Sequence, residues 1–191
     1  MFNFIRDNNF GILFSQVDAQ PFATHLPFLL EEKGGENTIL TSHMAKSNPH
    51  WKTLNNKEVL VVFSGPHSYI SPIWYREPNT VSTWNYVAVH IYGKVKIIEN
   101  EERLLEILEQ TVRFYEGKYG ENAEMPKNDQ FIQGLMKGIV GFELEINRIE
   151  GKWKLNQNHS IERQFNTIEG LRKTSDQNAN AIANLMEENI K

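Results

Sequence analysis

Hydroxyl, ammonium and amide groups follow one another in a short stretch of the chain. The run is Thr41, Ser42, His43, Met44, Ala45, Lys46, Ser47 and Asn48. Asn48 precedes Pro49, a pairing typical of a helix N-cap with proline at the first helical position. Backbone N–H groups at a helix start, with Lys46 and the hydroxyls, can bind a phosphate. The alternative is an ordinary strand-to-helix turn with a solvated lysine.

A second stretch is dense in aromatic residues and bounded by prolines. It covers residues 65–75, with Tyr69, Trp74 and Tyr75, and continues in the Thr-Trp-Asn-Tyr run of residues 83–86. Aromatic faces and amide edges can hold a planar heterocycle, and Trp and Tyr also suit a subunit interface with one wet side. We therefore expect a loop that forms a ligand wall or a dimer contact. The alternative is core filling.

Several other kinds of site are excluded or disfavoured. The chain has no cysteine, so disulfides, thiolate metal sites and a cysteine nucleophile are absent. Its six histidines lack the His-Glu-x-x-His spacing of zinc enzymes, and we expect no metal. The formal net charge of -4 gives no general attraction to nucleic acid. The C-terminal stretch 176–191 is acidic, which disfavours a DNA-reading helix there.

The pattern of apolar residues predicts strands first and helices late. We expect a short helix within 1–9, strands over 10–17, 21–30, 38–42, 58–63, 84–98 and 138–149, and a Gly-Gly turn at 34–35. Helices are expected over 101–119, 129–136, 160–172 and 176–188. This order indicates an α+β protein in which an antiparallel barrel carries its helices outside. No apolar run is long enough to cross a bilayer and the first residues lack a signal peptide, so we expect a cytoplasmic protein.

The order and spacing of several segments resemble one known family. The segments are residues 10–13, 23–27, 43–49, 65–71, 74–75, 83–86, 89–94, 137–142 and 154–158. Together they resemble the PaiB family of FMN-binding negative transcriptional regulators, over nearly the whole chain. The resemblance implies a flavin-reductase-like split β-barrel and a homodimer with FMN at the subunit interface. We accordingly expect an FMN-binding split-barrel domain over 1–155 and a C-terminal helical extension of that domain over 156–191.

The resemblance and the chemistry together predict the cofactor-binding residues. They are His25, Ser42, His43, Ala45, Lys46, Ser47, Asn48, Tyr69, Trp74, Trp84, Asn85, Lys94, Lys154, Gln157 and Asn158. Lys46 is expected at the FMN phosphate, with Lys94 as the next choice. Catalytic residues are not predicted.

The stretch 153–158 is expected at the flavin ring. It holds one aromatic residue, one cation and three amides, and amides can match the donors and acceptors of the pyrimidine edge. Lys154 would lie near N1–C2=O, where a fixed cation stabilises the reduced flavin. The alternative is that this stretch only closes the barrel.

Three departures from the family pattern are visible. Family members usually begin earlier, so one edge of the barrel or dimer is expected to differ. Asn156 stands where the family usually has serine, and His159 where a basic residue commonly follows. Both side chains can still donate hydrogen bonds.

Three functions remain open from the sequence. The first is a flavin-containing regulator that acts on DNA or a regulatory partner, although the charge does not support direct DNA contact. The second is an FMN-dependent oxidoreductase or flavin reductase. The third is a haem-binding relative of the same barrel with a histidine as axial ligand.

Overall fold

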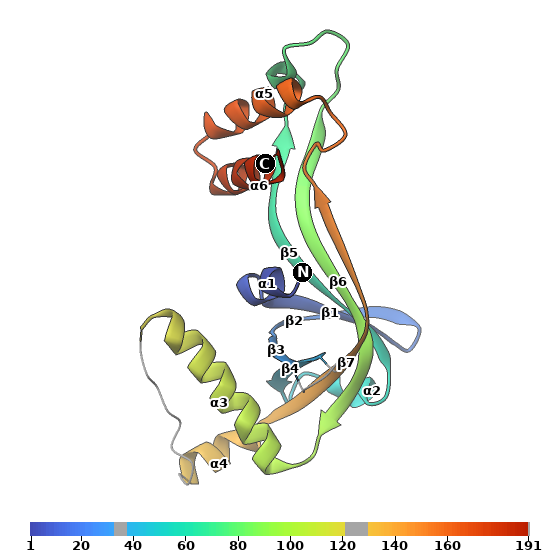
Figure 1. Cartoon of the computed structure of the whole chain (residues 1–191). Helices are drawn as coiled ribbons and strands as arrows, with labels where there is room; N and C mark the ends of the chain where they lie inside the picture. The colour runs from blue at the N-terminus through green and yellow to red at the C-terminus, as the bar shows by residue number, and fades with distance from the viewer. Residues whose placement is uncertain (33–37, 121–129, 191) are drawn as a thin grey trace. The chain divides into compact units, whose positions relative to one another are not determined.

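The structure is a computed structural model that describes residues 1–32, 38–120 and 130–190. Its strands are β1 (Phe10–Val17), β2 (Gln20–Pro27), β3 (Leu29–Glu32), β4 (Thr38–Ala45), β5 (Glu58–Ile70), β6 (Thr83–Ile98) and β7 (Ile139–Lys154). They form one sheet in the order β2-β1-β5-β6-β7-β4-β3 (Figure 1). β1 pairs antiparallel with β2 and β5, and β4 pairs antiparallel with β3 and β7. The prediction of an α+β protein with an antiparallel sheet is confirmed.

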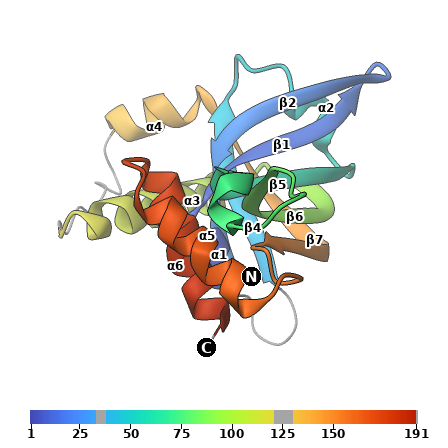
Figure 2. The ribbon, with the colours of Figure 1, turned by 90° about the horizontal axis from the view of Figure 1, so that it is seen from above.

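The helices follow the expected order. They are α1 (Phe2–Asp7), α2 (Trp51–Leu54), the 3₁₀ helix η1 (Pro72–Tyr75), α3 (Glu101–Lys118), α4 (Gln130–Met136), α5 (Ile161–Arg172) and α6 (Gln177–Ile190). Side-chain caps fix two of the starts, because Asn100 accepts from Arg103 N and Ser160 accepts from Arg163 N. α5 and α6 pack against each other and lie side by side in Figure 2. Of the helices within the described ranges, none is long and apolar enough to cross a membrane.

The chain divides into two compact units. The first unit comprises residues 1–63 and 90–150, and the second unit comprises residues 64–89 with the described residues from Gly151 onward. β5, β6 and β7 each contribute residues to both units. In the first unit, inward-facing residues of these strands alternate with exposed ones, as Val61, Phe63, Ile91 and Val95 are fully buried. In the second unit, the buried residues of α6, among them Ile182 and Met186, share one face of that helix.

One predicted strand is divided in the structure. Residues 21–30 were expected to form a single strand, but β2 ends at Pro27 and β3 begins at Leu29. Phe28 between them is fully buried and packs edge-on against the rings of Phe63 and Phe142. Its N–H donates to Asn9 O at 2.8 Å. Phe28 thus lies at the junction of β2 and β3, hydrogen-bonded to the residue before β1 and with its ring in the core.

Three other boundaries differ from the prediction. β4 is longer than expected and α2 begins only at Trp51, so Pro49 does not start a helix. The expected aromatic loop is strand as far as Ile70 and then the helix η1, whose N-cap Ser71 accepts from Ile73 N. β7 continues through Lys154, beyond the predicted end at Ile149. The predicted turn at Gly34–Gly35 and the predicted helix start at Asp129 lie outside the described residues.

Candidate functional site

The predicted phosphate-binding stretch forms an exposed turn in the first unit. We call residues 45–50 the Lys46 turn. Three of its backbone N–H groups already have protein acceptors: Lys46 N donates to Gly138 O at 2.8 Å, Asn48 N to Ala45 O at 2.9 Å, and His50 N to Asn48 Oδ1 at 3.0 Å. Asn48 thus closes a local turn and does not cap a helix at Pro49. A phosphate here would depend on the exposed side chains of Lys46 and Ser47.

The other predicted residues of the first unit differ in exposure. Ser42 of β4 is 2% exposed and its hydroxyl donates to Pro27 O at 2.6 Å, so it links β4 to the end of β2. His43 is half-buried, and burial lowers its pKa. His25 is exposed on β2 and stacks near Phe10, with ring centroids 6.2 Å apart. Lys94 is exposed on β6.

A buried histidine supports the Lys46 turn. His50 is fully buried, and its Nε2 lies 2.7 Å from Ser15 Oγ while its Nδ1 lies 2.8 Å from Thr24 Oγ1. Asn48 Nδ2 also donates to Thr24 Oγ1, at 3.3 Å. Burial lowers the pKa of His50. The histidine joins β1, β2 and the turn, a role that its sequence position did not indicate.

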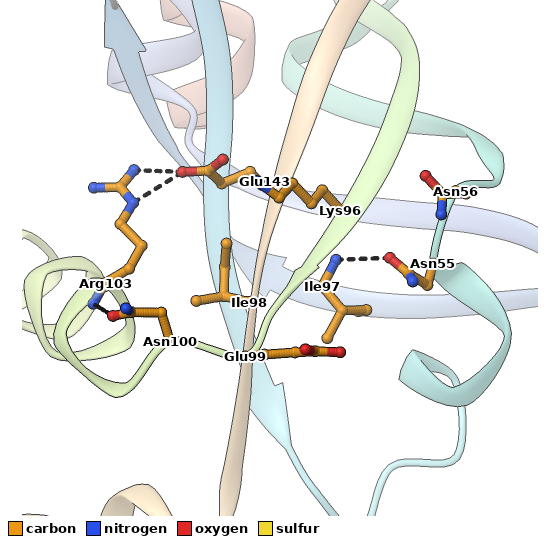
Figure 3. A pocket seen from close by; sticks show the side chains of 9 residues that line it. All are labelled: Asn55, Asn56, Lys96, Ile97, Ile98, Glu99, Asn100, Arg103 and Glu143. Carbon is orange, nitrogen blue, oxygen red and sulfur yellow. Dashed lines mark hydrogen bonds and ion pairs between the residues drawn. The ribbon is translucent and has the colours of Figure 1, made fainter.

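A hollow of about 720 Å³ in the first unit is lined mainly by polar residues (Figure 3). Arg103 lies at one side, where its Nε donates to Glu143 Oε1 at 2.8 Å and its other nitrogens pair with Glu31 and Glu106. Hydrogen bonds to these carboxylates, Glu31 first, raise the pKa of Arg103. Asn55 accepts from Ile97 N at 3.1 Å, as Figure 3 shows. The side chains with the best donors here are thus already engaged in holding α3 and β7 in place.

Lys154 has a fixed position in the second unit. Its Nζ donates to Thr83 Oγ1 at 2.6 Å and to the carbonyl of Trp84 at 2.8 Å. An ammonium has three N–H donors, and one remains beyond these two bonds. Thr83 was not predicted; its position before the aromatic Trp84 at the start of β6 was the available signal.

Three aromatic side chains of β5 and β6 contact one another in the second unit. We call His67, Tyr69 and Trp84 the aromatic platform. His67 and Trp84 stack with ring centroids 5.8 Å apart and an interplanar angle of 22°, and Tyr69 meets Trp84 edge-on at 6.1 Å. Tyr69 and Trp84 are 48% and 47% exposed. The second unit thus presents partly exposed aromatic faces, and a lysine ammonium that is held at the start of β6 by Thr83 and the Trp84 carbonyl.

Other predicted residues of the second unit are engaged in packing. A Cβ added to Gly170 of α5 would lie 2.3 Å from the Trp74 ring, so this indole lies directly on α5. Tyr75 is 1% exposed beneath the Arg163 guanidinium, 3.8 Å from the ring centroid. The expectation that Tyr75 forms part of an exposed aromatic patch is therefore wrong.

The amides of the second unit fall into two groups. Gln157 is exposed but folds back, accepting from Leu155 N at 2.8 Å and donating to Trp153 O at 2.6 Å. Asn158 is exposed. Asn85 is fully buried; its Nδ2 donates to Met186 Sδ at 3.5 Å, and its Oδ1 has no hydrogen-bond donor within the part of the chain that the structure describes. Gln157 and Asn85 use their amides in contacts within the protein, whereas the amide of Asn158 is exposed.

The fold places the protein in a known structural class. It resembles the flavocytochrome Anf3 from Azotobacter vinelandii, with a TM-score of 0.61 and 16% identity over 86% of this chain and 71% of that one. It also resembles an FAD and heme binding protein from Mycobacterium smegmatis, with a TM-score of 0.60 and 14% identity over 86% and 74% of the two chains. The protein has the flavin-reductase-like split-barrel fold, as predicted.

The sequence then defines the family. Residues 1–148 match the family described as "Putative FMN-binding domain". The chain is also 38% identical over 194 aligned positions to "Protease synthase and sporulation protein PAI 2" of Bacillus subtilis, covering 100% of this chain and 92% of that protein. The chain belongs to this family, and the resemblance to PaiB proteins is confirmed.

Proposed function

We propose that this protein binds FMN non-covalently as a homodimer and acts as a flavin-dependent regulator of the PaiB type. The observation that carries the proposal is that a chain of an FMN-binding domain family has in its second unit both the partly exposed aromatic platform and the fixed ammonium of Lys154. FMN in particular is suggested by the family description, and the names of two proteins of the same fold, a flavocytochrome and an FAD and heme binding protein, include a flavin.

The aromatic platform suits the isoalloxazine ring. Flat faces of Trp84 and Tyr69 can contact the ring, and the remaining Lys154 N–H can donate to a hydrogen-bond acceptor. The acceptor we assign is the N1–C2=O edge. Negative charge grows there when a flavin is reduced, so this chain would favour the reduced form.

The phosphate of FMN is assigned to the Lys46 turn. Lys46 and Ser47 are exposed, and within the described ranges Lys46 has no ion-pair partner. A phosphate dianion needs a cation and hydroxyl donors, which these two side chains supply. Lys94 on β6 is the next choice.

The homodimer is assigned to exposed apolar side chains of the second unit. Besides the platform, Ile73, Val81, Ile161 and Phe165 are 83%, 78%, 62% and 54% exposed. Soluble monomers rarely leave large contiguous apolar patches in water. A second copy of the chain would cover such side chains and bury the flavin.

Regulation is assigned to a protein partner. The formal charge of -4 and exposed Asp176 and Glu188 do not favour contact with DNA phosphates. A salt-sensitive, sequence-preferring gel shift with the purified protein would instead support direct DNA binding.

The experiment is to purify the protein, record its visible absorbance and identify the ligand released by heat with mass spectrometry. Flavin absorbance and FMN in the supernatant are expected, and sedimentation should give twice the mass of the chain. A Soret band would indicate haem, and rapid NAD(P)H oxidation by the bound flavin would indicate a reductase.

A matched pair of variants tests the dimer surface. Phe165→Glu on α5 should yield monomers, whereas Tyr119→Glu, which changes an 81% exposed residue of the first unit, should leave the dimer intact. A monomeric parent protein with flavin bound would contradict the interface.

A further inference from the structure

A second hollow in the first unit, of about 430 Å³, has the size of a small-molecule site. It is lined by residues from α2, β6, α3, α4 and β7. Its lining shares only Lys46 with the residues assigned above to the flavin.

The floor of this hollow is apolar and partly rigid. Leu104 and Val140 are each 8% exposed, and Ile98 and Met136 are half-buried. Trp51 also lines the hollow, and its indole N–H donates to Lys46 O at 3.0 Å, which fixes the ring. A ligand with an apolar side chain would find a preformed contact surface here.

Charges of both signs surround this floor. Lys46 and Lys137 are brought together because Lys46 N donates to the carbonyl of Gly138. Glu99 and Glu101 lie on either side of Asn100, the N-cap of α3. Across residues 1–32, 38–120 and 130–190, none of these four charged side chains has an ion-pair partner.

We propose that this hollow binds a free α-amino acid with an apolar side chain. Its carboxylate pairs with Lys137, its ammonium with Glu99 and Glu101, and its side chain packs on the floor beside Trp51, whereas Lys46 at the edge of the hollow stays with the FMN phosphate. A simple amine or fatty acid would use only half of the charges.

The test is equilibrium dialysis of the purified protein with labelled L-leucine and, separately, L-phenylalanine. Saturable binding of at least one of them, at one per chain, is expected. Isoamylamine lacks the carboxylate and 4-methylpentanoate lacks the ammonium, so each should compete with leucine at least about fivefold more weakly than unlabelled leucine does. Absence of saturable binding, or equal competition by either analogue, would overturn the proposal.

Two variants locate the site without touching the residues assigned to FMN. Lys137→Met should weaken amino-acid binding about fivefold, and Glu101→Gln by a similar factor, each the effect of one exposed ion pair. Lys52→Met, which removes an exposed lysine of α2 outside the hollow, is the matched control and should bind as the parent does.

FMN affinity is measured on the same variants, and it should not change. If Lys137→Met weakened FMN and left the amino acid unaffected, the hollow would belong to the flavin and the proposal would be wrong.

Discussion

The Lys46 turn and the Lys154 region each present an ammonium to the flavin in our proposal, but they hold it differently. Lys154 is fixed by Thr83 and the Trp84 carbonyl, whereas Lys46 extends from an exposed turn whose backbone donors are already used. A fixed charge has a defined direction before the ligand arrives, and a mobile one must be ordered on binding, at a cost of about 0.5–1.5 kcal/mol. The fixed ammonium of Lys154 suits an effect on the reduction potential of the flavin ring, and the mobile ammonium of Lys46 suits binding of the phosphate.

The largest expected effect is on FMN affinity and follows from removing the ammonium of Lys46. A hydrogen bond between charged groups contributes about 1.5–3 kcal/mol, so Lys46→Ala should weaken FMN binding roughly 10- to 100-fold. Riboflavin has no phosphate and should lose little affinity in the same variant. Fluorescence titration with both ligands measures the difference, and Lys52→Ala is the control. Unchanged FMN affinity would place the phosphate elsewhere, with Lys94 tested next.

The second prediction weakens the packing of the unit that holds Lys154. Gly170→Ala places a Cβ 2.3 Å from a Trp74 ring atom, and such overpacking costs about 1–3 kcal/mol. Gly117→Ala is the control, because nothing lies within 4 Å of its added Cβ and alanine favours a helix by roughly 0.5–1 kcal/mol. Chemical denaturation should show opposite signs for the two variants. A stabilised Gly170→Ala protein would mean that Trp74 does not lie on α5.

The third prediction concerns the fixed charge. Lys154→Met should lower FMN affinity only modestly, about tenfold or less, while making the midpoint potential of the bound flavin more negative. Lys152→Met, an exposed lysine of the same strand, should change neither quantity. Spectroelectrochemistry gives the potential. An unchanged potential in Lys154→Met would remove the stretch 153–158 from the site.

The smallest expected effect is a pH dependence in the Lys46 turn. Burial lowers the pKa of His50 below 6.5, so just below pH 6.5 the unfolded chain binds a proton that the folded chain does not. The contribution of neutral His50 to the free energy of unfolding is therefore complete above pH 6.5, and it declines as the pH falls toward the lower pKa of His50 in the folded protein. His50→Gln should flatten this part of the profile of unfolding free energy against pH. His25→Gln, a change at an exposed histidine, should leave the profile as it is.

Much of the fold could be predicted because it depends on local pattern. The turn at Asp18 and Ala19, with positive φ angles of 51° and 61°, the strand β1 and the caps Asn100 and Ser160 all follow from neighbouring residues. The division at Phe28 could not be predicted, because it depends on rings of Phe63 and Phe142 that are distant in sequence.

The site was predictable by residue type and not by geometry. Lys154 was identified from its amide-rich surroundings, but its acceptor Thr83 lies 71 positions away in the sequence. Trp74 and Tyr75 had the composition of a ligand wall; Gly170 and Arg163, which pack against them, come from α5. Sequence pattern does not encode which face of an aromatic segment a later helix will cover.

The ion pairs of Arg103 limit the order in which substitutions can accumulate in this sequence during evolution. It is the shared cation of Glu31 and Glu143, whose side chains are only 21% and 13% exposed. Replacing Arg103 first would remove the cation that these two half-buried carboxylates share, whereas the same replacement is milder once one glutamate has become glutamine. The order of substitutions therefore matters at these positions: a lineage can lose the arginine only after losing an acid, and related chains that lack the arginine should also lack at least one of the two acids.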